Sequence, residues 1–258
     1  MTDFEYIQTK VEGELGFIEL NRPHVLNAIN QKMVIEILDC LERYDEEESV
    51  KVIVLTGNGR AFAAGADIEE MATVGAVDIE LKNQFRSWDH IAEIKKPIIG
   101  AVQGFALGGG FELALCCDLL FAANNAEFGF PEVQLGIMPG AGGTQRLTKL
   151  IGKTRAMEWL LTGDRMSATE AERLGIINQT FMPELLLEET VRFTQKIAEQ
   201  PSLSVRMIKE ATLKAVDMSV AEGMKFERKN FSLLFSSEDQ KEGMQAFMEK
   251  RKPNYRGR

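Results

Sequence analysis

The stretch spanning residues 97–146 constrains the fold more than any other part of the chain. A short apolar run at 98–102 follows Pro97, which favours extended structure, so the run predicts a strand. Glycines follow at Gly104, Gly108, Gly109 and Gly110. The next apolar run, at 111–117, is interrupted only by Glu112 and predicts a helix. Backbone N–H groups in a turn between such elements lack an intrahelical partner, and they can hold a negatively charged oxygen.

Two glutamates accompany this glycine turn. Glu112 stands inside the apolar run, and Glu132 stands in the loop at 130–132. Two carboxylates beside a turn rich in N–H donors are typical of acid/base chemistry on a carbonyl compound. The alternative is a tight helix–strand packing turn with one partly buried, hydrogen-bonded glutamate. The glycines alone favour that alternative, but the glycines together with Glu112 and Glu132 favour catalysis.

The glycines also match, superficially, a dinucleotide-binding fingerprint through Gly104, Ala106 and Gly109. That fingerprint requires an acidic residue at the end of the next strand, about 20 residues further on. Asp118 comes too early, and Glu127 follows no clear strand–helix–strand unit. The sequence therefore favours an acid/base enzyme over a nicotinamide-dependent dehydrogenase.

Composition sets limits on the class of protein. The chain has 258 residues, 45% of them hydrophobic, which suffices for one substantial core or a domain with a smaller appendage. A net charge of −9 argues against a general binder of nucleic acids or anionic membranes. No apolar run approaches the length of a membrane span, and the first residues resemble neither a signal nor a transit peptide. We expect a cytoplasmic protein.

Cysteine and histidine are scarce. Cys40, Cys116 and Cys117 form an odd set without the CxxC spacing, which suits buried thiols in a reducing compartment. The two histidines, His24 and His90, are too few for a metal site or a histidine-dependent triad, so we expect solvated or structural roles for both. The sequence therefore predicts no bound metal.

Hydrophobic patterning predicts an α/β domain followed by helices. Strands are expected at 6–11 and 15–20, paired as a hairpin, and at 50–56, 98–102, 119–122, 133–135 and 176–181. Helices are expected at 30–48, 81–94, 111–117, 140–151, 157–161 and 167–174, the last begun by a capping box, and at 185–200, 202–215, 220–235 and 237–247. A small-residue turn at 61–68 is expected to begin another helix and to offer more free N–H groups.

Three further features leave alternatives open. Phe85, Trp88 and Ile91 recur at helical spacing, which indicates a core face or the border of a pocket. The helices beyond residue 183 are rich in Met and Phe and favour contact with a neighbouring subunit about as strongly as packing within the chain. The basic tail at 250–258 is either solvated or a contact for an anion such as phosphate.

Short motifs run along the chain in a fixed order, and together they are specific. They are RP at 22–23, LNA at 26–28, AFAAGADI at 61–68, KP at 96–97, GFALGGGFEL at 104–113, FGFPE at 128–132, PGAGGTQR at 139–146, LTG at 161–163 and EGMQAF at 242–247. In these motifs the sequence resembles the enoyl-CoA hydratase (crotonase) family over essentially its whole length.

The resemblance implies a fold of repeated ββα units wound into a spiral, with a catalytic core at 1–183 and a helical trimerisation region at 184–258. It implies a trimer or a dimer of trimers, and an acyl-CoA thioester as substrate. The backbone N–H groups of Ala66 and Gly109 are expected to form an oxyanion hole. Glu112 and Glu132 are expected to hold one water, which the N–H of Gly140 helps to orient. No redox or metal cofactor is implied, because coenzyme A is part of the substrate.

The resemblance also assigns contacts with the substrate and its CoA moiety. These are Ala28, Ala64, Ala66, Asp67, Ile68, Gly109, Phe130, Phe247 and Lys250, with the last two able to act across a subunit boundary. Phe130 occupies a position that is often Gln in short-chain hydratases of the family, which predicts a more apolar pocket beside Glu132.

Two glutamates favour a hydratase, which adds water to a trans-2-enoyl-CoA to give a 3-hydroxyacyl-CoA, in fatty-acid or related acyl-CoA degradation. An enoyl-CoA isomerase and a branched-chain hydratase of the methylglutaconyl type remain open alternatives. From a different class, an RNA-binding protein is disfavoured by the acidic charge and by the lack of a dense basic, aromatic patch. A non-catalytic CoA-binding scaffold is disfavoured by the intact pair of glutamates.

Overall fold

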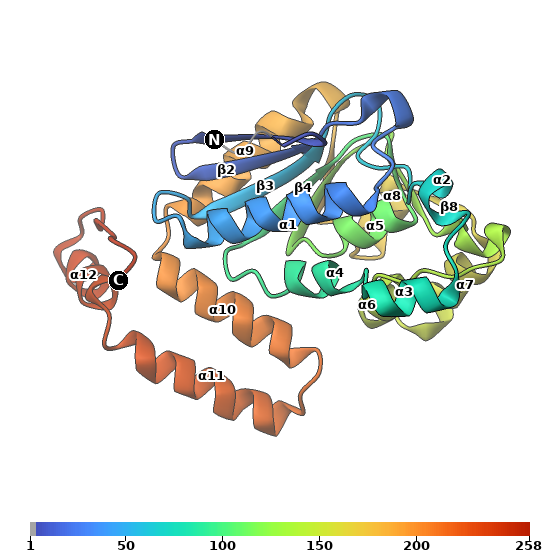
Figure 1. Ribbon diagram of the computed structural model, residues 1–258. Coiled ribbons are helices and arrows are strands. Elements are labelled where there is room, and N and C mark those ends of the chain that lie inside the picture. The colour runs from blue at the N-terminus through green and yellow to red at the C-terminus, as the bar shows by residue number, and fades with distance from the viewer. Residues whose placement is uncertain (1–3) are drawn as a thin grey trace.

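The computed structural model describes residues 4–258, and for Lys82 only the backbone. Its larger sheet has the order β1-β2-β3-β4-β6-β9 (Figure 1). The strands are β1 (Ile7–Glu12), β2 (Leu15–Leu20), β3 (Val52–Gly57), β4 (Ile98–Val102), β6 (Leu119–Ala123) and β9 (Gln179–Phe181). β1 and β2 form the expected antiparallel hairpin, and every later neighbour in this sheet pairs in parallel.

A smaller sheet of three short strands lies beside the larger one. Its order is β5-β7-β8, with β5 (Phe105–Leu107) parallel to β7 (Glu127–Gly129) and β7 antiparallel to β8 (Arg165–Ser167). β5 leads directly into helix α5 (Gly109–Ala114), so this sheet brings the predicted glycine turn and the segment before Glu132 side by side.

Helices cover the sheets and extend beyond them. They are α1 (Gln31–Glu46), α2 (Ile68–Met71), α3 (Ala76–Lys82), α4 (Arg86–Ile91), α5, α6 (Gly143–Ile151), α7 (Lys153–Thr162), α8 (Ala168–Arg173), α9 (Leu186–Ala198), α10 (Ser202–Ala215), α11 (Val220–Leu234) and α12 (Glu238–Glu249). Short 3₁₀ turns are η1 (Pro23–Val25), η2 (Pro131–Leu135) and η3 (Pro183–Leu185). Ser167 caps α8 by accepting a hydrogen bond from the N–H of Glu170, which is one half of the expected capping box, while the Glu170 carboxylate accepts from Arg173.

Both faces of β3 and β4 at the centre of the larger sheet are buried, as the continuous apolar run at 50–56 predicts. Ile53 and Leu55 of β3 belong to a core shared with α1, whereas Val52 and Val54 belong to a second core closed by α9. Because strand side chains alternate between faces, one unbroken apolar run serves two helical layers. Figure 1 shows α1 and α9 on opposite sides of the strands.

The last three helices stand away from this body (Figure 1). α10 is tied to the sheet by Lys209, whose ammonium lies 2.7 Å from the carboxylate of Asp118. That carboxylate also accepts a hydrogen bond of 2.8 Å from the N–H of Ile98 in β4. Large apolar side chains on these helices are exposed in the single chain: Ile208, Leu213, Val216, Val220, Met224, Phe231, Leu233, Phe235, Met244, Phe247 and Met248.

Two expectations about elements are wrong, and three short strands were not expected. The segment 133–135 is not a strand but part of η2, because Pro131 starts a turn that the N–H groups of Gly136 and Ile137 close onto preceding carbonyls. The helix expected at 81–94 is shorter and is present only as α4, because Asn83 adopts the left-handed conformation with φ +43° and ends the preceding helix α3, which was not expected. The three strands of the smaller sheet were not predicted, because three residues are too few to display a period.

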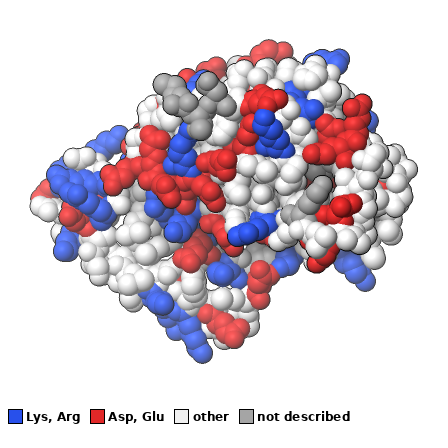
Figure 2. All heavy atoms as spheres, in the orientation of Figure 1, with Lys and Arg blue, Asp and Glu red and all other residues white. Residues whose placement is uncertain are grey.

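The described surface mixes both signs of charge. On the face in Figure 2, acidic and basic side chains are interspersed over the body and the C-terminal helices. Among residues 4–258, no helix combines the length and the apolar character that crossing a membrane requires.

Candidate active site

A cavity of about 270 Å³ opens between the large sheet's helices and the smaller sheet. It is lined by small residues of the turn at 64–66, by the start of α5, by η2 and the segment 137–141, and by side chains from α1, α2 and α4. Of the site residues expected from the sequence, the cavity brings together Ala64, Ala66, Ile68, Gly109, Glu112, Glu132 and Gly140. These come from five separate segments, so only the fold makes them neighbours.

Glu112 is held in the cavity wall by backbone N–H groups. It lies in α5 and is buried, with 4% of its surface exposed. Its Oε1 accepts hydrogen bonds of 2.7 Å from the N–H of Ala141 and 2.8 Å from that of Gly143. Burial raises the pKa of Glu112, and the N–H groups of Gly143, Ala141 and Gly140 oppose that rise. The Gly140 amide therefore lies near this carboxylate, and its expected role in orienting a water stays a prediction.

Glu132 has the opposite environment. Its Oε2 is buried and has no hydrogen-bond partner among the described residues. Burial raises the pKa of Glu132 to about 7, and the nearby charge of Glu112 adds to the effect. Gly108 makes room for this carboxylate: its φ is +49°, and a Cβ added there would lie 2.8 Å from Oε1 of Glu132. The N–H groups thus offset part of the rise in the pKa of Glu112, whereas a pKa of about 7 leaves a substantial share of the Glu132 carboxyl protonated near neutral pH.

The N–H groups of Ala66 and Gly109 face the same space. A Cβ built on Gly109 would lie 3.6 Å from the backbone nitrogen of Ala66. Ala66 forms a parallel bridge with Ile29, in which the neighbouring residues make the hydrogen bonds and leave its own N–H unused. Gly109 is the first residue of α5, so its N–H has no intrahelical acceptor. Within the described chain, neither N–H donates to a protein atom, and both are available to an anionic oxygen.

Glycine is required where α5 approaches the strand segment that carries this pair. A Cβ on Gly110 would lie 2.1 Å from the carbonyl oxygen of Ala63. Ala63 in turn bridges to Ala106, the middle residue of β5. The close backbone contact sets the separation of the two free N–H groups.

Asn27, one residue of the LNA motif, holds two segments of the site together through side-chain hydrogen bonds. It is fully buried, with φ +56°. Its side-chain amide donates to the carbonyls of Asn58 (2.9 Å) and Ala61 (2.8 Å), and its Oδ1 accepts from the N–H of Arg22 at 2.8 Å. These bonds join the segment 22–28 to the turn that ends at Ala66. No periodicity reveals this role, because the partners lie 31 and 34 residues away.

Ala28 and Asp67, which were expected to contact the substrate, do not line the cavity and take part in hydrogen bonds within the chain. The guanidinium of Arg22 donates to the carboxylate of Asp67 at 2.9 Å and to the carbonyl of Ala28 at 2.6 Å. The N–H of Ala64 donates to Leu26 at 3.0 Å. Ala28 and Asp67 therefore shape the turn beside the cavity.

Phe130 does not line the cavity. Its ring is buried and stacks on Phe111, with centroids 4.8 Å apart. A Cβ on Gly143 would lie 2.7 Å from the same ring. The ring thus supports the segment whose N–H groups hold Glu112.

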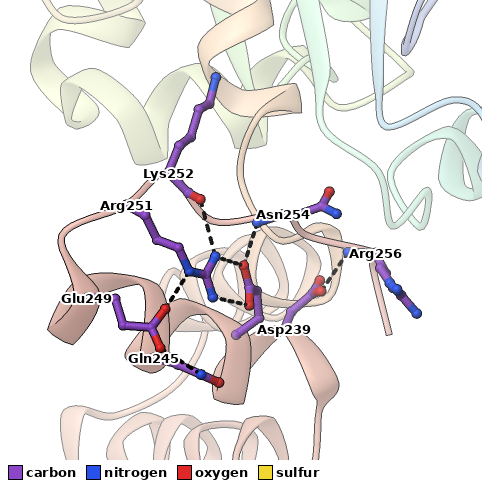
Figure 3. A network of polar contacts seen from close by, with 8 residues as sticks. Asp239, Gln245, Glu249, Arg251, Lys252, Asn254 and Arg256 are labelled. Carbon is purple, nitrogen blue, oxygen red and sulfur yellow. Dashed lines mark hydrogen bonds and ion pairs between the residues drawn. The ribbon is translucent and has the colours of Figure 1, made fainter.

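Phe247 lies in α12 and Lys250 is its C-cap, and Figure 1 shows this helix far from α2, α4 and α5, which contribute to the cavity lining. The Phe247 side chain is 85% exposed. The basic tail beyond them folds back on α12 through paired charges: Arg251 contacts Glu242 and Glu249 at 2.6 Å each. Figure 3 shows this network, which includes the bond from the N–H of Arg256 to Asp239.

Other cavity-lining residues were not singled out as site residues. Phe85 and Trp88 line the cavity, whereas Ile91 packs in the core. The three residues at helical spacing therefore form both the border of a pocket and part of a core face, the two roles that their pattern left open. Glu70, Gln84 and Met71 also line it, and nothing in the sequence pattern marked them. Among residues 4–258, no group of three or more His, Cys, Asp or Glu side chains is placed to hold a metal ion.

Comparisons with known proteins identify the family of the chain. The family model for enoyl-CoA hydratase/isomerase matches residues 10–258. A probable enoyl-CoA hydratase of Rhizobium meliloti is 46% identical over 255 residues, 99% of each chain, and the mitochondrial enoyl-CoA hydratase of Pongo abelii is 45% identical over 98% of this chain and 89% of its own. A crystal structure of enoyl-CoA hydratase subunit I from Geobacillus kaustophilus is 62% identical, with a TM-score of 0.98 over the whole of both chains. The chain belongs to the enoyl-CoA hydratase/isomerase family.

Proposed function

We propose that this protein adds water across the C2–C3 double bond of a trans-2-enoyl-CoA and forms a 3-hydroxyacyl-CoA. One observation carries the proposal: two glutamates, one bound by backbone N–H groups and one with an oxygen that has no partner among the described residues, face a cavity beside two backbone N–H groups that donate to no described protein atom. The hydratase names of relatives that match nearly the full chain support the same reaction.

The N–H groups of Ala66 and Gly109 bind the thioester carbonyl oxygen. Water adds to a simple alkene with difficulty, because no atom accommodates the developing negative charge. Conjugation lets that charge reach the carbonyl oxygen as an enolate. Donors that are already positioned stabilise the charge without reorganising, and losing one such donor costs about 3 to 4 kcal/mol of transition-state stabilisation.

Glu112 and Glu132 hold one water between them. The Glu112 carboxylate takes a proton from the water while the water oxygen bonds to C3. The π electrons move to C2 and the carbonyl, and the Glu132 carboxyl then donates its proton to C2 as the enolate collapses. The product gains one H and one OH, and a proton passes from Glu112 to Glu132, through solvent, before the next turnover.

The environments of the two carboxyls support this division of roles. Two N–H hydrogen bonds to Glu112 favour its charged form, which a base requires. The partnerless Oε2 of Glu132 and its pKa of about 7 favour the protonated form, which an acid requires. Like charges close together strengthen the difference.

The reaction requires no redox or metal cofactor, and coenzyme A enters as part of the substrate. We place the protein in the cytoplasm, in fatty-acid or related acyl-CoA degradation, and its three free cysteines suit a reducing compartment. The helical region 184–258 carries assembly into a trimer or a dimer of trimers, which covers the apolar side chains exposed on α10 to α12. There Phe247 and Lys250 reach the CoA of a neighbouring subunit.

Loss of absorbance of the conjugated thioester on adding crotonyl-CoA tests the reaction. Wild type is expected to hydrate it, and Glu112→Gln and Glu132→Gln each to lose activity by orders of magnitude. Glu184→Gln, which removes an exposed carboxylate in η3, serves as the control and retains the rate. Loss in only one active-site variant indicates isomerase-like chemistry with a single base. No turnover of any enoyl-CoA contradicts the proposal.

A further inference from the structure

Helix α6 begins at the Glu112 carboxylate. The N–H of Gly143, the first residue of α6, donates to Oε1 of Glu112 at 2.8 Å, and the N–H of Ala141 donates to the same oxygen at 2.7 Å. The positive end of a helix attracts anions and disfavours cations. The first turn of α6 contains no acidic residue of its own. The anion at this helix end is therefore Glu112, which stands on a different helix.

Arg146 stands at the same end of α6, where a cation is normally unfavourable. It is the fourth residue of the helix, and its N–H donates to the carbonyl of Gly142 at 2.8 Å. Its side chain turns back toward the helix start, because a Cβ added to Gly142 would lie 3.1 Å from Nε and 3.5 Å from Cδ of Arg146. Gly142 lies between the two residues whose N–H groups hold Glu112. The side chain therefore lies beside the segment that carries both donors.

The guanidinium of Arg146 makes no ion pair and no hydrogen bond with another described residue. The residue is nevertheless partly buried, and its charge acts on α5, which packs against α6. Burial raises the pKa values of the Cys116 and Cys117 thiols, and the charge of Arg146 opposes the rise in both. The guanidinium thus lies within electrostatic range of the end of α5, the helix that carries Glu112.

We propose that Arg146 is a positioning residue for the reaction, whose guanidinium keeps Glu112 in the ionised form that a base requires. The inference rests on the proposed hydratase function and names the cation on which the base depends. Burial raises the pKa of Glu112, and the N–H groups around it and the charge of Arg146 oppose that rise. This role explains an arginine at the positive end of a helix, because the helix end and the guanidinium stabilise the same carboxylate.

Other charged groups also lie around α5. They are Glu132 of η2, Asp89 of α4, Asp118 in the segment after α5, and Lys209 of α10. Lys209 pairs with Asp118 at 2.7 Å, so its charge is already balanced. Two carboxyls close together favour a state in which one of them keeps a proton. Arg146 decides which one, because a cation that stabilises charge on Glu112 leaves the proton on Glu132.

The pH dependence of kcat/KM for crotonyl-CoA tests the inference on the full-length protein. Arg146→Gln is expected to move the acid limb of the profile to higher pH, because a base without its cation is protonated more readily. The loss relative to wild type is expected to be about tenfold on the acid limb and smaller on the alkaline side. Arg155→Gln, which removes an exposed cation of α7 that pairs with Glu158, is the matched control and leaves the profile unchanged.

Arg146→Lys separates charge from packing. The guanidinium donates no hydrogen bond to a described residue, so a lysine ammonium supplies the same charge and is expected to restore most of the acid limb. A merely structural role would lower the rate by a similar factor at every pH and leave the limb in place. An acid limb that does not move in Arg146→Gln, or that moves as far in Arg146→Lys, overturns the inference.

Infrared difference spectra between the protein and its Glu112→Gln variant follow the ionisation of the Glu112 carboxyl without any substrate. The carboxylate band is expected to persist to lower pH with Arg146 in place than in the Arg146→Gln background. Such a shift supports the role of Arg146 even if no enoyl-CoA turns over. An identical titration in both backgrounds overturns the inference and leaves the hydratase proposal intact. If Arg146→Gln does not fold, Arg146→Met takes its place in both measurements.

Discussion

Glu132→Gln is expected to stabilise the protein at high pH while it abolishes activity. The folded pKa of Glu132 is about 7, against 4.5 for an ordinary glutamate. The folded state therefore binds this proton more tightly than the unfolded state does. The stability that the protonated carboxyl contributes is fully present below pH 4.5 and is lost as the pH rises through 7. A glutamine stays neutral throughout and does not incur that loss.

The structure sets the size of the effect. A pKa difference between 4.5 and about 7 corresponds to about 3 kcal/mol in the free energy of unfolding. Because the Glu132 carboxyl is only partly buried, solvent screening lowers this to about 1 to 2 kcal/mol. Its Oε2, which has no partner among the described residues, is the atom whose charge burial penalises. The variant is thus expected to match wild type near pH 4.5 and to exceed it by about 1 to 2 kcal/mol at pH 8.5.

Urea unfolding followed by tryptophan fluorescence measures this difference at several pH values and one fixed protomer concentration. The exposed control Glu184→Gln corrects for the loss of one surface charge. Titration of other groups occurs in both proteins and cancels in the comparison. A stability difference that stays flat between pH 5 and 8.5, or that favours wild type at high pH, would refute the assignment of Glu132 as the carboxyl that burial keeps protonated.

Three further substitutions test the frame around the site. Asn27→Ala removes three buried hydrogen bonds and is expected to cost about 3 kcal/mol in urea unfolding. Gly108→Ala places a Cβ 2.8 Å from the Glu132 carboxylate and is expected to lower kcat about tenfold or more. The control is Gly136→Ala, which is also at positive φ but has open space around it. It is expected to lower the stability of the fold and to leave kcat unchanged. Lys209→Met breaks a largely buried ion pair and is expected to cost about 3 kcal/mol, with earlier proteolysis in α10.

Much of the frame follows from local pattern. The hairpin, the buried strands β3, β4 and β6 and the long helices appear where alternation and helical spacing predict them, because burial on one or two faces imposes those periods. The capped start of α8 was predicted for a similar reason, since a cap is satisfied within four residues. Elements shorter than a period, or broken by one left-handed residue such as Asn83, were missed or misassigned.

The same distinction between local pattern and long-range contact applies to the candidate site. The residue types and their order were legible in the chain: a glycine turn with two glutamates, and small residues before Asp67. Which atoms face one another was not. Glu112 accepts hydrogen bonds from N–H groups that lie 29 and 31 residues away in the sequence. Ala66 forms a bridge with the distant residue Ile29, and its N–H lies beside the start of α5.

The sequence by itself therefore determined the elements, the family and the chemistry that the side chains can perform. Tertiary structure alone decided that Glu112 is held by backbone donors, while Oε2 of Glu132 has no partner among the described residues. It also decided which side chains of distant segments line the cavity together. The physical reason is range: propensity and periodicity act within a few turns of chain, whereas desolvation, shared hydrogen bonds and packing act between whichever segments the fold brings together.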